Sequence, residues 1–201
     1  MNNARPLSLN EVQNIFSQVL HDFIGHFTPF SAGMEILTDL QDPVWDLIQS
    51  AKNQMYAQIN LIRFLFRQGI GTNKEAQSVL KTYMEHEKIT INGCIRCFPK
   101  VTAGLALWLS KQVYGNSTPH LFIKESSISI QADHVRQDAQ SEDKTLISGQ
   151  SINSPREGYA LYLFHLAYLE NVCFSVKRNA THLSVQWEWA ENNRPCKHPS
   201  K

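Results

Sequence analysis

The sequence predicts an α+β fold in which a helical N-terminal half is followed by a small antiparallel sheet packed against a central helix. Three observations predict it. Helical patterns of apolar residues fill most of residues 1–88. The runs 120–131 and 182–189 have the period of two that is typical of half-buried strands. Between them, residues 154–174 form an apolar segment with a clear helix start.

The first predicted helix follows a capping box formed by Ser8 and Glu11. The apolar residues after the box recur at i, i+3, i+4 and i+7, which predicts an amphipathic helix that ends near Gly25. These residues are Val12, Ile15, Phe16, Val19, Leu20 and Phe23. A loop that contains Pro29 and Gly33 is expected next.

Two further helices are expected before residue 88. Asp42 and Pro43 are a good N-cap and first-turn pair, and the apolar face after them predicts one long helix, broken at most once, up to Gly69. Thr72 and Glu75 mark the start of a third helix. The first 88 residues are therefore expected to be mostly helical.

The middle of the chain mixes strands and a helix. Residues 89–92 are either a short strand or an extended linker, and Pro99 can open a helix that ends at Gly115. Two short runs, 120–124 and 127–131, have the spacing of a β-hairpin. The polar composition of residues 134–153 predicts a surface loop.

The predicted central helix begins at Ser154, which forms a capping box with Glu157 around Pro155. Its apolar residues surround it almost completely, as expected for a buried helix. The strand 182–189 should place one face on this helix and pair with the 120–131 hairpin. The residues of that apolar face are Leu183, Val185, Trp187 and Trp189.

The length of 201 residues suits one continuous unit, in which a helical region over 1–88 leads into an α+β domain over 89–201. Charged residues make up 18% of the chain and the net charge is +1, which argues against DNA binding by charge alone. The sequence shows neither a leader segment nor a membrane span, so we expect a cytoplasmic protein whose four cysteines stay reduced.

Cys94 and Cys97 form a C-x-x-C motif, which can be a redox pair or half of a zinc site. A zinc site would need two more ligands, and only Cys196 and His198 near the C-terminus are available. Free cysteine is often a small core residue. Two small buried thiols are therefore the preferred interpretation, and no metal site is predicted.

His165 lies in the apolar helix, where it could contact a ligand, hold a metal or act as a base. A core histidine with a local hydrogen bond is the more common case. The sequence contains no P-loop, dinucleotide fingerprint, zinc-protease motif or hydrolase serine motif. We therefore predict neither an enzyme nor a cofactor. Any enzyme would depend on Cys94, Cys97 and His165.

Aromatic residues gather near the junction expected between the central helix and the sheet. They could line an apolar cavity for a small molecule, although aromatics at this spacing are more often core packing. If a pocket exists there, its ligand-binding residues are expected to be Trp108, Tyr162, His165 and Trp187. Phe122 and Trp189 are further aromatics of the same region.

The second half of the chain resembles the effector-sensing, arabinose-binding-like domain of AraC/XylS-type transcription regulators. The resemblance rests on the order and spacing of six segments: 97–109, the strands 120–124 and 127–131, the helix 154–174, the strand 183–189, and 193–201. It implies a regulatory ligand-sensing and dimerisation domain with a small-molecule effector. DNA would be bound only through a helix-turn-helix region that this chain lacks. The alternative is a non-enzymatic protein interaction or accessory module.

Overall fold

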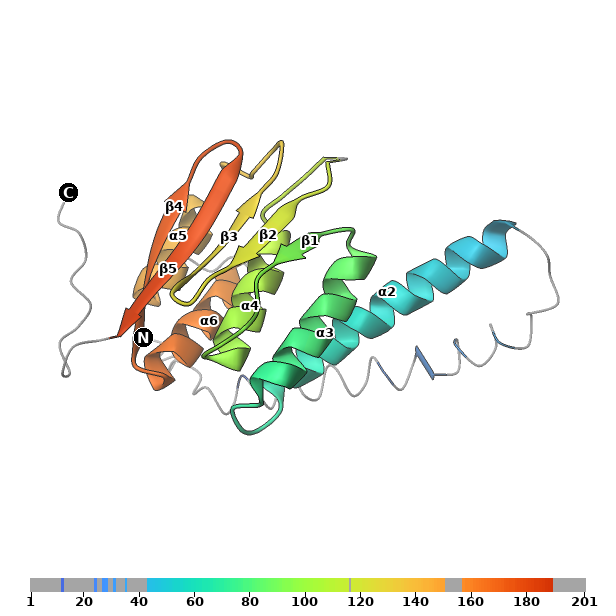
Figure 1. Cartoon of the computed structure of the whole chain (residues 1–201), viewed down its shortest axis with the longest axis horizontal. Coiled ribbons are helices and arrows are strands. Elements are labelled where there is room, and N and C mark those ends of the chain that lie inside the picture. The colour runs from blue at the N-terminus through green and yellow to red at the C-terminus, as the bar shows by residue number, and fades with distance from the viewer. Residues whose placement is uncertain are drawn as a thin grey trace, which may run out of the picture. The chain divides into compact units, whose positions relative to one another are not determined.

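The structure is a computed structural model of the chain with an α+β fold (Figure 1). It divides into two compact units, residues 1–69 and residues 70–201. The residues that the structure describes are 12, 24, 27–28, 31, 35, 43–115, 117–150 and 157–189. Among them, no helix combines the length and the apolar character that crossing a membrane requires.

The first unit contains α2, Pro43–Phe66, a continuous helix of 24 residues. The long second helix is therefore confirmed, and it ends just before Gly69, whose φ is +84°. The Phe27 ring lies edge-on to Tyr56 at 5.0 Å, and Lys52 Nζ is 3.0 Å from Glu35 Oε1. Phe27 contacts Tyr56, whereas Glu35, later in the sequence, contacts Lys52, which comes earlier in α2. The described residues before α2 therefore run antiparallel to it.

The start of the first predicted helix and its predicted end near Gly25 lie outside the described residues. Phe27, Thr28, Ser31 and Glu35 are helical, so the loop expected after Gly25 is wrong at these positions.

The second unit is built on a five-stranded sheet with the order β1-β2-β3-β5-β4. The strands are β1 Thr90–Asn92, β2 His120–Ile123, β3 Ser127–Gln131, β4 Val172–Arg178 and β5 His182–Trp189. β1 runs parallel to β2, and the other three pairs are antiparallel. The sheet is thus mixed rather than purely antiparallel. The hairpin and the pairing of β5 with β3 are confirmed, whereas β4 was assigned to the end of a helix.

One face of the sheet is apolar because the strand register aligns alternate residues. Leu121, Ile130 and Leu183 lie opposite one another on three neighbouring strands, and all three are fully buried. A second row contains Ile123, Ile128 and Val185. These rows form one wall of the core. For β5, the period-two pattern correctly predicted that Leu183, Val185 and Trp187 are buried.

Helices cover this apolar face, and Figure 1 shows α4, α5 and α6 on the same side of the sheet. The helices of this unit are α3 Asn73–His86, α4 Pro99–Ser110, α5 Gln140–Ser148 and α6 Glu157–Leu169. The Thr72 side chain caps α3 by accepting a hydrogen bond from Glu75 N, as predicted. Almost every residue of α4 is buried, so α4 shares the central position expected for α6 alone.

Three sequence-based expectations are corrected here. The expected surface loop over 134–153 contains α5, which buries Leu146 and Thr145 and ends at Gly149. The helix that starts at Pro99 stops at Ser110 rather than near Gly115. Trp189, which was expected on the buried face, is the last residue of β5 and is 68% exposed.

Candidate functional site

The four predicted ligand-binding residues lie on three elements of the second unit. Trp108 on α4, Tyr162 on α6 and Trp187 on β5 are buried, and His165 on α6 is half-buried with its ring edge-on to Phe164. All four residues belong to the second unit. Whether they bind a ligand stays a prediction.

Trp108 and Trp187 have different partners at the two ends of α4. The Trp108 indole N–H donates to Glu142 Oε2 at 3.3 Å, close to the C-terminal end of the helix. Trp187 hydrogen-bonds the sulfur of Cys97, just before the helix begins. At 1.5 Å per residue, the helix holds these two contacts well apart. They belong to two distinct groups of polar residues.

The group at the C-terminal end of α4 is centred on the buried carboxylate of Glu142. Its Oε2 accepts hydrogen bonds from Trp108 Nε1 and from Gln112 Nε2, the latter at 2.7 Å. Its Oε1 accepts from Arg136 Nη1 at 3.3 Å. Both oxygens are therefore occupied, which removes most of the penalty for burying this charge.

Arg178 on β4 extends this group. Its guanidinium forms a bidentate ion pair with Asp143, with Nε–Oδ2 at 2.7 Å and Nη2–Oδ1 at 2.6 Å. It also donates to Arg136 O and to Gln112 Oε1. Glu142 and Asp143 are neighbours on α5, so we call the five residues Gln112, Arg136, Glu142, Asp143 and Arg178 the α5 network. Its mutual pairing explains why the polar sequence of α5 belongs inside the fold.

Three tyrosines form a further polar cluster, separate from the two groups at the ends of α4. They are Tyr83 on α3 and Tyr159 and Tyr162 on α6. The hydroxyl oxygens of Tyr83 and Tyr159 are buried. The Lys111 side chain hydrogen-bonds Tyr83, and the Tyr159 hydroxyl has no hydrogen-bond partner within the described residues. Burial raises the pKa of Tyr159 well above its ordinary value, and the nearby phenols of Tyr162 and Tyr83 raise it further. A buried hydroxyl without a partner costs about 1–3 kcal/mol. The buried Tyr159 hydroxyl therefore lowers the stability of the folded state.

The group at the N-terminal end of α4 is the segment Gly93–Phe98, which we call the cysteine loop. Cys94 is a free and exposed thiol, and Cys97 is free and half-buried, so the preferred interpretation of two buried thiols is wrong for Cys94. Within the segment, Gly93, Cys94 and Arg96 are exposed, whereas Ile95 and Phe98 are buried. Cys173 in β4 is disulfide-bonded, which contradicts the expectation that all four cysteines stay reduced.

Charged and polar contacts hold the cysteine loop in place. Arg96 Nη1 lies 2.5 Å from Glu125 Oε1, and the hydrogen bond of this guanidinium with Cys94 is the main cause that raises the pKa of Arg96. Cys97 Sγ donates to Glu125 O at 3.4 Å. From the start of α3, Asn73 Nδ2 donates to Arg96 O at 2.6 Å. The exposed end of the loop is thus fixed on both sides.

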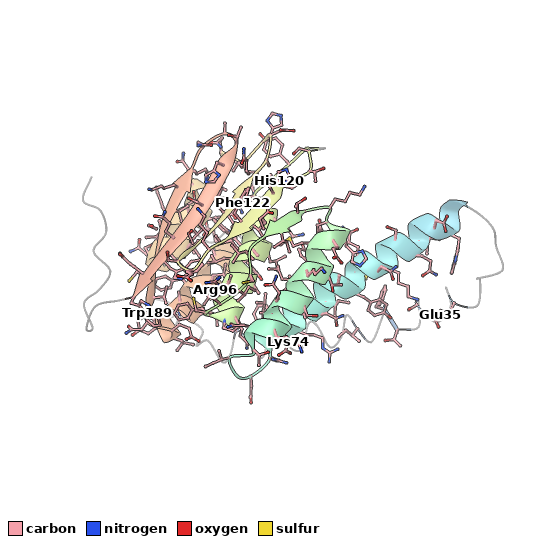
Figure 2. All side chains as sticks on the ribbon, in the orientation of Figure 1. Glu35, Lys74, Arg96, His120, Phe122 and Trp189 are labelled. Atoms are coloured by element: carbon pink, nitrogen blue, oxygen red, sulfur yellow. The ribbon has the colours of Figure 1, made fainter. Side chains whose placement is uncertain are left out.

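Phe98 connects the loop to α4 in an unusual backbone conformation. Its φ of 49° is left-handed, which L-residues rarely adopt, and Pro99 follows directly. The Phe98 ring packs on Trp189 with centroids 4.9 Å apart. Figure 2 shows Arg96 and Trp189 at the same end of the sheet. Sequence reasoning singled out the two cysteines but not Arg96, Glu125 or Phe98, because these meet only through the fold.

Within the described ranges, no three histidine, cysteine or acidic side chains gather as a metal site would require. The exposed histidines of this part are His86 at the end of α3, His120 on β2 and His134, whose ring stacks on Tyr114 at 5.7 Å. None of these was singled out from the sequence.

Comparisons with known proteins identify a similar fold. The solved structure of a bacterial phosphotransferase matches 92% of this chain and 98% of its own, with a TM-score of 0.69 and 18% sequence identity. The histidine kinase domain of a blue-light activated histidine kinase from Erythrobacter litoralis matches 90% of this chain and 95% of its own, with a TM-score of 0.39 and 10% identity. Only the first of these scores supports a shared fold. No protein-family description and no curated protein matches the chain.

Proposed function

We propose that this protein carries a phosphoryl group on a histidine and passes it between partner proteins. The observation that carries the proposal is the match in fold to a bacterial phosphotransferase over nearly the full length of both chains. Such a match includes the helical first unit as well as the sheet. At 18% sequence identity, the match supports a shared fold, and the activity is our inference from that fold.

A phosphoryl carrier needs a nucleophile that is exposed to its partners. Histidine is one of the side chains that form covalent intermediates through an imidazole nitrogen. In the described part of the chain, His165 is half-buried in the apolar helix α6 and His134 is stacked on Tyr114. Neither lies on an open helical surface, whereas His86 is exposed as the last residue of α3, where the helix ends. The first 35 residues contain two further histidines, His21 and His26.

The sequence pattern favours His21 as the acceptor. It lies two positions after Val19 and two before Phe23, which are apolar residues of the first predicted helix. At 100° per residue, His21 is about 160° from each of them, on the polar side of that helix. Asp22 follows directly and could orient the imidazole or accept its proton. This step rests on the pattern, since 21 and 22 lie outside the described residues.

Phosphorylation by phosphoramidate, a small phosphoryl donor with a P–N bond, tests the proposal. We expect the intact protein to gain one phosphoryl group, detected by mass, that is lost in acid and retained in base, as a P–N bond requires. His21→Gln should abolish the gain. His26→Gln is the matched control, because position 26 lies on the apolar side of the same pattern, and it should retain the gain. Absence of phosphorylation, or label that persists in His21→Gln, would contradict the proposal.

A second candidate is the ligand-sensing and dimerisation domain implied by the regulator resemblance. The observation that favours it is the buried hydroxyl of Tyr159, which has no partner within the described residues and lies next to Tyr162, one of the predicted ligand-binding residues. A small molecule with a polar group could hydrogen-bond this hydroxyl. In a thermal-shift screen of metabolites, a hit should raise the melting temperature of the wild type but not of Tyr159→Phe.

The partners differ between the two candidates. Phosphoryl transfer needs a donor protein and an acceptor protein in the cytoplasm, where we propose that the chain acts. Ligand sensing needs a small-molecule effector and a second copy of the chain, with DNA bound only through another region. Sedimentation of the full chain with and without phosphorylation would show which assembly forms.

A further inference from the structure

We propose that Cys94 and Cys97 form a thiol–disulfide exchange site that reacts with low-molecular-weight disulfides, with Cys94 as the attacking thiol and Cys97 as the resolving thiol. The two residues are the free cysteines among the described positions. Their C-x-x-C spacing allows a disulfide to close within a four-residue loop. The inference does not depend on phosphoryl transfer.

Exposure assigns the two roles. The thiol that attacks an external disulfide must be reachable from solvent, and Cys94 is exposed. The thiol that resolves the mixed disulfide needs only to reach the first sulfur, and Cys97 is half-buried beside Trp187 and Glu125. Burial also raises the pKa of the Cys97 thiol, which keeps Cys97 protonated while Cys94 reacts.

Arg96 supplies the charge that the first step needs. Its guanidinium hydrogen-bonds Cys94, so a positive charge lies beside the attacking sulfur and attracts an anionic disulfide such as oxidised glutathione. The Arg96–Glu125 ion pair and the Asn73 contact to Arg96 O keep this guanidinium on the loop. The arrangement thus contains an exposed thiol, an adjacent cation and a second thiol two residues further on. A core pair of cysteines would need none of these.

The exchange balances as two consecutive displacements. The Cys94 thiolate attacks one sulfur of the small disulfide RSSR, so the protein–SR bond forms, the S–S bond breaks and one RS⁻ leaves with its electron pair and takes up a proton. Cys97 then loses its proton to solvent and attacks the Cys94 sulfur, which expels the second RS⁻. The two protein thiols are oxidised to a disulfide, and RSSR is reduced to two RSH.

Closing this disulfide would change the surface at that end of the molecule. Cys97 Sγ now donates to Glu125 O and lies against Trp187, and the next residue, Phe98, packs on the exposed Trp189. Movement of Cys97 toward Cys94 would break the first contact and shift Phe98. The oxidised and reduced proteins would therefore present different surfaces to a partner.

Incubation of the full reduced chain with oxidised glutathione, followed by peptide mapping by mass spectrometry, tests the proposal. We expect the wild type to yield a Cys94–Cys97 disulfide with no glutathione retained. Cys97→Ser should retain one glutathione at Cys94, because nothing resolves the mixed disulfide. Cys94→Ser, a change at an exposed position that should not affect folding, should leave Cys97 as a thiol over the same period.

A rate measurement tests the role of Arg96. Arg96→Gln should slow the reaction of Cys94 with oxidised glutathione roughly threefold at neutral pH and low salt, because the anionic disulfide loses the positive charge that attracts it to Cys94. Arg63→Gln, at an exposed arginine on α2, is the control and should leave the rate unchanged. The proposal would be overturned by any of three results. Both thiols could persist in the wild type, the wild type could retain a stable glutathione adduct, or Cys97 could react faster than Cys94.

Discussion

The two ends of α4 contain similar kinds of side chain in opposite environments. At the C-terminal end, the α5 network buries carboxylates and guanidinium groups, and the side chains of Glu142 and Arg178 are 5% and 7% exposed. At the N-terminal end, Arg96 and Glu125 form an ion pair whose side chains are 65% and 75% exposed. One pair of charges is inside the fold and the other lies in solvent.

This difference indicates which residues serve the fold. A buried charge is tolerated only where its partners are in place, so the α5 network is sufficiently explained by the joining of α4, α5 and β4. An exposed ion pair contributes little stability, so the fold gives no reason for Arg96 to contact both Glu125 and the free thiol of Cys94. The cysteine loop is therefore the better place to look for chemistry.

The largest expected effect comes from breaking the α5 network. Arg178→Ala removes both hydrogen bonds to Asp143 and leaves that carboxylate, whose side chain is 15% exposed, without its cation. Loss of one partner of a buried ion pair typically costs about 3–5 kcal/mol. Urea unfolding followed by circular dichroism should show a loss of this size in the free energy of unfolding.

The matched control is Lys177→Ala, one residue earlier on β4 and exposed. It should change the free energy of unfolding by less than about 0.5 kcal/mol. Equal effects of the two substitutions would mean that Arg178 is not buried in a paired network.

A somewhat smaller loss is expected at Gly93, where the cysteine loop leaves β1. Its φ is +105°, and a Cβ there would lie 2.1 Å from the backbone oxygen of Ile123. Gly93→Ala should cost about 2–4 kcal/mol, from left-handed strain and the clash with backbone. Gly69→Ala shares the positive φ but meets nothing within 4 Å, so it should cost about 1 kcal/mol. Urea unfolding of both variants would measure the difference, and equal losses would refute the clash.

Those parts of the fold that depend on local pattern were predictable from the sequence. The cap of α3 at Thr72 needs only a side chain and a backbone N–H three residues away. The hairpin of β2 and β3, and the inward direction of Leu183 and Val185, follow from a period of two. These features depend only on residues that are close together in the sequence.

The parts that depend on distant partners were not predictable. Glu142 is buried because it meets Trp108 and Gln112, which lie 30 or more positions earlier, so α5 looked like a surface loop. The C-x-x-C motif was visible, but the exposure of Cys94 and its contact with Arg96 follow from the position of the loop in the fold. A single sequence carries no signal for contacts between residues that lie so far apart in the chain.

A stabilising change is expected at the tyrosine cluster, which differs from the α5 network because the buried Tyr159 hydroxyl has no partner within the described residues. Tyr159→Phe removes an unpartnered hydroxyl and should raise the free energy of unfolding by about 1 kcal/mol. The raised pKa of Tyr159 means that the folded protein favours the neutral phenol. Stability from this preference is present below about pH 10 and falls at higher pH, once the unfolded chain ionises. Urea unfolding at neutral and alkaline pH should show a weaker alkaline decline in the variant; an unchanged or steeper decline would contradict the assignment.

The smallest effect is expected at Trp189, two residues after Trp187 on the same strand. Trp187 is 7% exposed and Trp189 is 68% exposed, so the pair compares the interior with the surface at one end of β5. Trp187→Ala should cost about 3–5 kcal/mol, as large-to-small changes in a core do. Trp189→Ala removes mainly its ring contact with Phe98 and should cost less than about 1 kcal/mol. Urea unfolding measures both. A large loss for Trp189→Ala would mean that this end of the molecule is part of the core. A small loss would leave Trp189, next to the cysteine loop, as a surface aromatic that the fold does not require and that a partner can contact.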